Sequence, residues 1–154
     1  MTDIDLLNGL SPERAAGLMA LGNRLLLTTG SELFHLGDAA ENIYVVARGR
    51  VRLTLPMEVR GHEENILVEE RSSGQTVGWS ALIPPYRFTL TASAQLDTAV
   101  IAFSREALTS YFANHPDTGY AVSLNLSSVI GHRLQLFQAM WLREIQRMVE
   151  LRCA

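Results

Sequence analysis

The chain has 154 residues, a net charge of −3 and 19% charged residues, which is ordinary for one domain with a sizeable core. It lacks the excess of basic residues typical of nucleic-acid binders, and it has no apolar run long enough to cross a membrane. We therefore expect this chain alone to bind neither nucleic acid nor a membrane. The single cysteine, Cys153, excludes an internal disulfide and a thiolate metal cluster, and the acidic N-terminus is unlike a signal peptide, which predicts a cytoplasmic protein.

A helix is predicted near the N-terminus. Ser11 suits the N-cap, Pro12 the first helical position and Glu13 the first turn. The apolar residues that follow recur at helical spacing, namely Ala15, Leu18, Met19 and Leu21. We therefore expect a helix of about ten residues. A first strand over residues 25–27 and a turn over residues 28–31 come next.

Residues 32–103 have the composition of short strands joined by turns. Residues 43–47 and 51–55 are β-branched and apolar, and Gly49 between them suits a tight turn that requires positive φ. Residues 60–64 predict a polar hairpin tip before residues 66–68. Many short strands with regular turns indicate a closed sandwich, here a β-roll of the jelly-roll type with an interior and a mouth.

The most informative stretch is residues 68–102. It begins as a strand, breaks at residues 72–74, and is interrupted again at Pro84 and Pro85. An alternating, β-rich run then continues over residues 88–103. Between the two breaks lies a turn that starts at Gly78 and continues through small or hydroxyl residues. Such a turn can direct several backbone N–H groups into a concavity and bind an anion there.

The C-terminal part has a helical period. No proline occurs over residues 118–152, and apolar residues recur at spacings of three and four: Leu126, Ile130, Leu134, Phe137, Trp141, Ile145 and Met148. A helix of roughly 30 residues would be about 45 Å long. Its distal half would expose an apolar face, so we expect a parallel, two-fold homodimer through this helix. The predicted division is a β-roll domain with the N-terminal helix over residues 1–115 and the long helix over residues 116–154.

The order strand, glycine-initiated turn, arginine, Thr/Ser/Ala-rich strand resembles the phosphate-binding cassette of the cyclic nucleotide-binding domain, as in the sensory half of Crp/Fnr regulators. The resemblance spans residues 10–151 and implies an α+β fold, a cyclic nucleotide-binding-like β-roll with an N-terminal helix and a long C-terminal dimerisation helix. It implies a small-molecule ligand, with a cyclic nucleotide as the candidate, and we expect no metal site. The ligand-binding residues implied in the cassette are Gly78, Trp79, Ser80, Ala81, Leu82, Arg87, Thr89 and Thr91, and those implied on the long helix are Arg133 and Leu134.

Two positions depart from the family pattern. Trp79 stands where the family's nucleotide binders place a glutamate that accepts hydrogen bonds from the ribose 2′-hydroxyl. Arg87 is followed by Phe88 before Thr89, so its register is displaced by one residue. Trp79 either fills the pocket or stacks on a base, and Arg87 is either a phosphate contact or a solvated loop residue. Arg133 either meets an anion or lies on the dimer surface.

The function that the resemblance implies is ligand sensing by a regulatory domain of Crp/Fnr type, part of or derived from a transcription regulator. Ligand entry under the cassette would reposition the long helix by a population shift. Nothing in the chain corresponds to a winged helix-turn-helix, so we expect no DNA-binding domain in it. One alternative is a ligand-free dimeric interaction module whose pocket is filled by Trp79 and Phe88.

The other alternative is a haem or redox sensor. The four histidines, which lack the spacing of a metal motif, are His35, His62, His115 and His132. No nucleophile, base and orienting group occur at motif spacing, so we expect no enzyme activity.

Overall fold

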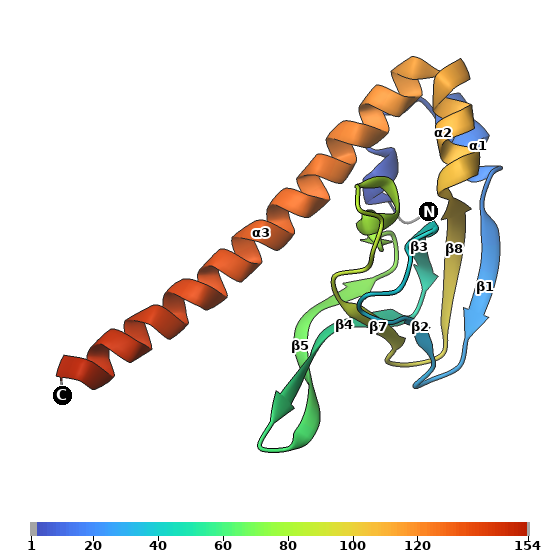
Figure 1. Ribbon diagram of the computed structural model, residues 1–154. Helices are drawn as coiled ribbons and strands as arrows, with labels where there is room; N and C mark the ends of the chain where they lie inside the picture. Colours follow the sequence, from blue (N-terminus) through green and yellow to red (C-terminus); the bar gives the residue numbers. More distant parts are fainter. Residues whose placement is uncertain (1–2, 154) are drawn as a thin grey trace.

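The structure is a computed structural model that describes residues 3–153. Its elements follow in the order η1 (Asp5–Leu7), α1 (Pro12–Met19), β1 (Asn23–Leu27), β2 (Glu32–Phe34), β3 (Asn42–Arg48), β4 (Arg50–Val59), β5 (His62–Ser72), β6 (Thr76–Val77), η2 (Trp79–Leu82), β7 (Thr91–Ala94), β8 (Thr98–Ser104), α2 (Arg105–Asn114) and α3 (Pro116–Cys153). The expected fold class is confirmed (Figure 1). Residues 1, 2 and 154, which belong to the predicted domain ranges, lie outside the described part.

Helix α1 begins where the local sequence predicts. The Ser11 side chain accepts a hydrogen bond from the Arg14 backbone N–H at 3.3 Å, and Pro12 occupies the first helical position. The helix has eight residues, slightly fewer than expected. It ends early because the next backbone N–H groups bond three residues back, Leu21 to Leu18 and Gly22 to Met19, both at 3.0 Å, which turns the chain into β1.

The strands form two antiparallel four-stranded sheets. Their orders are β1-β8-β3-β6 and β2-β7-β4-β5, which confirms the jelly-roll architecture. The β-rich run expected over residues 88–103 is divided between the sheets, with β7 in one and β8 in the other. Residues 95–97 form the crossing, where Asp97 Oδ1 accepts hydrogen bonds from the Thr29 backbone N–H at 2.9 Å and hydroxyl at 3.0 Å. These bonds hold the pKa of Asp97 below its ordinary value of 3.8.

The turn between β3 and β4 requires glycine. Gly49 has φ +97°, and a Cβ placed on it would lie 2.8 Å from the backbone oxygen of Asp97. Both the left-handed conformation and the close approach exclude a larger residue. The sequence prediction of a positive-φ turn at this position is confirmed.

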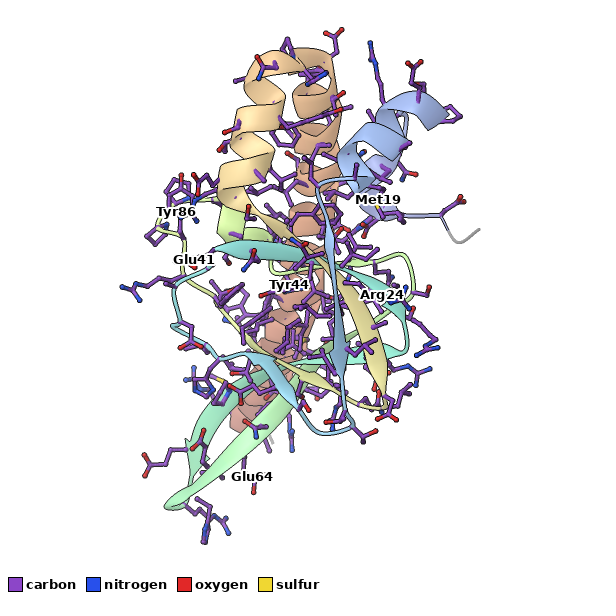
Figure 2. All side chains as sticks on the ribbon, turned by 90° about the vertical axis from the view of Figure 1, so that its right-hand side faces the viewer. Met19, Arg24, Glu41, Tyr44, Glu64 and Tyr86 are labelled. Atoms are coloured by element: carbon purple, nitrogen blue, oxygen red, sulfur yellow. The ribbon has the colours of Figure 1, made fainter. Side chains whose placement is uncertain are left out.

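The core lies between the two sheets and consists mainly of β-branched and aromatic side chains. Ile43, Val46, Val51 and Val100 are fully buried. Figure 2 shows Tyr44 among the side chains in the interior, and burial raises the pKa of its hydroxyl. This packing makes the roll a rigid frame for the residues at its mouth.

The β4–β5 hairpin extends beyond the roll (Figure 1), and Glu64 lies near its end in Figure 2. The polar tip was expected over residues 60–64. In the structure β5 already begins at His62, and the turn itself consists of Arg60 and Gly61, with φ of 51° and 81°.

Helix α3 is the longest element, with 38 residues that span about 57 Å. Its proximal half packs against η1 and α2, and Val122, Leu126 and Val129 are buried in this half. No residue of the helix beyond Arg133 is buried, and Figure 1 shows that this distal half of the helix extends away from the roll. The exposed apolar residues there are Leu134, Phe137, Trp141, Leu142, Met148, Val149 and Leu151.

Candidate functional site

The predicted cassette forms a glycine-initiated turn followed by the short helix η2. Gly78 has φ +83°, in the left-handed region, and precedes Trp79 directly. A Cβ on Gly78 would lie 3.1 Å from Phe88 Cε1 and 3.3 Å from Phe34 Cε2. The aromatic side chains therefore pack directly against the backbone of the turn, and this contact depends on glycine.

One small cavity brings together half of the predicted site residues. Its lining comprises Phe34, Leu53, Gly78, Trp79, Ser80, Phe88, Thr89, Leu90 and Arg133. The cassette and α3 thus meet at this cavity, as the resemblance implies.

The remaining predicted residues lie elsewhere. Ala81 is fully buried in the core, and Leu82 lines a separate hollow of about 240 Å³ between η2, α2 and α3. The Thr91 hydroxyl accepts a hydrogen bond from the Leu36 backbone N–H at 3.0 Å. Leu134 is 58% exposed on α3. None of these four lines the cassette cavity, and their ligand contacts stay predictions.

The cavity is almost entirely filled by aromatic rings. Phe88 stacks on Phe34 with ring centroids 3.6 Å apart and an interplanar angle of 6°. The free volume that remains is about 10 Å³, comparable to one water molecule. Trp79 is half-buried and packs against the core cluster. Phe88 is therefore the main residue that fills the pocket, with Trp79 at its side.

Arg87 lies outside this cavity. Its side chain is exposed, and its Nη1 donates to the carbonyl of Gly37 at 3.0 Å. The backbone of Arg87 also forms an isolated bridge with Ala39. The side chain is thus held against the loop between β2 and β3, and its predicted phosphate contact stays a prediction.

Arg133 is buried, contrary to the interpretation that places it on the dimer surface. It is only 8% exposed, and its Nε donates to Glu69 Oε2 on β5 at 2.6 Å. The second oxygen, Glu69 Oε1, accepts from Arg71 Nη1 at 2.8 Å. Arg71 Nη2 then donates to Asp5 Oδ2 at 3.1 Å.

These four residues form an ionic chain, Asp5–Arg71–Glu69–Arg133, that the sequence analysis did not identify. It connects the N-terminal segment, β5 and α3. Glu69 and Arg71 are two residues apart and so share one face of the strand, and this alternation was the only local signal. This ionic chain attaches α3 to the roll beside the cassette cavity.

Arg105 secures the loop that follows the cassette helix. Its Nη1 donates to the carbonyls of Ala40 at 2.6 Å and Ala81 at 3.0 Å. Its guanidinium lies 4.0 Å from the ring centroid of Tyr86, which Figure 2 shows at the edge of the molecule. The loop over residues 83–87 is therefore held to the start of α2.

The four histidines lie on separate elements: His35 in the loop after β2, His62 on β5, His115 between α2 and α3, and His132 on α3. Within residues 3–153, no three His, Cys, Asp or Glu residues are grouped as metal ligands would be. Over the same range, no helix combines the length and apolar character that a bilayer span needs.

Comparison with known proteins agrees with this fold. The chain is 28% identical over 130 residues to the cyclic AMP receptor protein of Thermus thermophilus, which covers 84% of this chain and 57% of that protein. It superposes on the crystal structure of the Thermus thermophilus catabolite activator protein with a TM-score of 0.74 and 26% identity, covering 92% of this chain and 63% of that one.

A second relative is an enzyme. The lysophospholipase NTE1 of Chaetomium globosum is 28% identical over 111 residues, which is 72% of this chain but 7% of the enzyme. The family model described as the cyclic nucleotide-binding domain matches residues 24–115. Since that match covers more than half of the chain, the protein belongs to the cyclic nucleotide-binding domain family.

Proposed function

We propose that this chain is a ligand-sensing regulatory domain of Crp/Fnr type, in which the cassette receives the ligand and α3 transmits the response. The observation that carries this proposal is the shared cavity: Arg133 of α3 lines it together with Gly78, Trp79 and Ser80 of the cassette. A ligand that enters between these elements contacts both, so it stabilises one arrangement of the helix relative to the roll.

The domain would form a homodimer through α3. The exposed apolar residues of α3 continue beyond the roll, where a second copy of the helix would cover them. We propose in addition a role in transcription regulation and a cytoplasmic location, as the resemblance to Crp/Fnr regulators implies. We propose no enzyme activity, because the similarity to the lysophospholipase is confined to a small share of that enzyme.

A cyclic nucleotide is the first ligand to test. Isothermal titration calorimetry of the purified protein against cyclic AMP and cyclic GMP should show saturable binding with a Kd below about 1 mM. Binding would also raise the melting temperature, because a ligand that binds the native state stabilises it.

The second candidate function is a ligand-free dimeric interaction module. The stacked pair Phe34 and Phe88 favours it, because the cavity beneath the cassette has no room for a nucleotide while both rings remain in place. For such a module, neither nucleotide would produce heat or thermal stabilisation.

The haem alternative is checked by the absorption spectrum of the purified protein, in which a Soret band would support it.

A further inference from the structure

We propose that Arg133 of α3, rather than Arg87, binds the anionic group of the ligand, and that this ligand is an aromatic anion. The inference rests on the proposed function, because it assigns a ligand class to the same cavity. Arg133 is 8% exposed and lines that cavity beside Gly78, Trp79 and Ser80.

The guanidinium of Arg133 has donors to spare. It carries five N–H groups, and the one on Nε is bound to Glu69. Among the hydrogen bonds within residues 3–153, none involves either Nη nitrogen of Arg133. Glu69 divides its charge between Arg133 and Arg71, so the pairing leaves Arg133 able to accept a second anion. The planar fork of an arginine suits phosphate or carboxylate oxygens.

Arg87 is not in position for this role. Its side chain is exposed, does not line the cavity, and donates to the Gly37 carbonyl at 3.0 Å. To reach the cavity it would have to break that bond and pass Phe88, which occupies the interior. Arg133 needs no such movement.

The aromatic part of the ligand follows from the stacked rings. Phe34 presents one ring face to Phe88 in a nearly parallel arrangement, at an interplanar angle of 6°. A planar ligand group could take the place of the Phe88 ring on this face. Gly78 has no side chain to obstruct it, whereas a Cβ at this position would lie 3.1 Å from Phe88 Cε1 and 3.3 Å from Phe34 Cε2. An aromatic ring that bears a phosphate or carboxylate therefore matches Phe34 and Arg133 together.

The test uses phenyl phosphate as the anionic probe and phenol as its uncharged control, with calorimetry on the full chain. Phe88→Ala opens the cavity, so it should bind phenyl phosphate more tightly than the wild type does and bind phenol weakly. In that background, the pair Glu69→Gln and Arg133→Gln removes both charges and leaves no buried charge unpaired. It should weaken phenyl phosphate binding by at least about tenfold, while Arg87→Ala changes the Kd by less than about twofold.

A further variant keeps the test valid if the double substitution fails to fold. In the Phe88→Ala background, Arg133→Lys retains the charge beside Glu69 but lacks the planar fork, so it should also weaken phenyl phosphate binding. Circular dichroism confirms that each variant is folded.

Three results would overturn the inference. A loss of affinity in Arg87→Ala with none in the Arg133 variants would assign the anion to the cassette arginine, and ligand sensing would stand. Equal affinity for phenol and phenyl phosphate would remove the anionic requirement. No saturable binding to Phe88→Ala at about 1 mM phenyl phosphate would refute the ligand class. The nucleotide titration of the wild type decides the proposed function separately.

Discussion

Replacing Glu69 by alanine should destabilise the protein more than any other single change of an exposed or half-exposed acidic residue in the roll. Glu69 is the shared partner of Arg71 and Arg133, which are 7% and 8% exposed. Arg71 would keep its ion pair with Asp5, in which Nη2 lies 3.1 Å from Asp5 Oδ2. Arg133 would lose its only ion-pair partner among the described residues. Removing one partner of a buried pair costs about 3–5 kcal/mol, and because the Glu69 side chain is 22% exposed we expect the lower end, about 3 kcal/mol.

The assay is equilibrium urea denaturation followed by circular dichroism, at one fixed protein concentration because the protein is expected to dimerise. Glu70→Ala is the matched control on the same strand. Glu70 Oε2 lies 3.9 Å from Arg50 Nη1 in an exposed ion pair, which should contribute under about 1 kcal/mol to the free energy of unfolding. Glu69→Gln keeps the shape and one acceptor and should fall between the two. If Glu69→Ala and Glu70→Ala were equally stable, the ionic chain would not hold α3 to the roll.

Three further predictions concern the helix, the turns and the acid response. Trp141→Glu places a charge on the exposed apolar face of α3, so sedimentation equilibrium should show a shift from dimer to monomer. Arg143→Glu, on the opposite face of the helix, should leave the dimer intact. A wild-type protein that is already monomeric at micromolar concentration would refute the dimer. Gly49→Ala should lower the free energy of unfolding by more than about 1 kcal/mol, measured by urea denaturation, because φ is +97° and the added Cβ meets backbone; an unchanged midpoint would contradict this. The hydrogen bonds from Thr29 lower the pKa of Asp97 in the folded protein below its ordinary value of 3.8. They therefore stabilise the protein at pH values above 3.8, and this contribution is lost as the pH falls through the folded pKa. Asp97→Asn should therefore lose less thermal stability than the wild type on acidification below that value, and parallel losses would be inconsistent with this assignment.

The fold was predictable because its signals are local. Ser11 and Pro12 mark the start of a helix, Gly49 marks a turn, and the apolar period of residues 118–152 marks a long helix. The division of residues 88–103 between two sheets was not predictable, because it involves long-range contacts: β7 pairs with β2 and β4, β8 pairs with β1 and β3, and Asp97 bonds to Thr29, 68 residues away. A sequence window holds no information on such a contact.

The site was predictable in part for the same reason. The glycine-initiated turn and the bulky Phe88 were visible in the sequence, and both lie at the cavity. The partner ring, Phe34, lies on a different strand, so the stacking could not be read locally. Arg133 pairs with a residue 64 positions away, which is why its burial was missed and a place on the dimer surface was considered. The direction of Arg87 likewise depends on Gly37 in a distant loop.

Hydrogen exchange measured by mass spectrometry, with and without saturating cyclic AMP, tests the central claim that the cassette and α3 respond as one unit. We expect protection to change both over the cassette, from Gly78 to Leu82, and in the middle of α3 around Arg133, because the start of the cassette and Arg133 line the same cavity. A change confined to the cassette, with α3 unaltered, would contradict transmission through the helix. No change in either segment would contradict sensing of cyclic AMP and favour the interaction module.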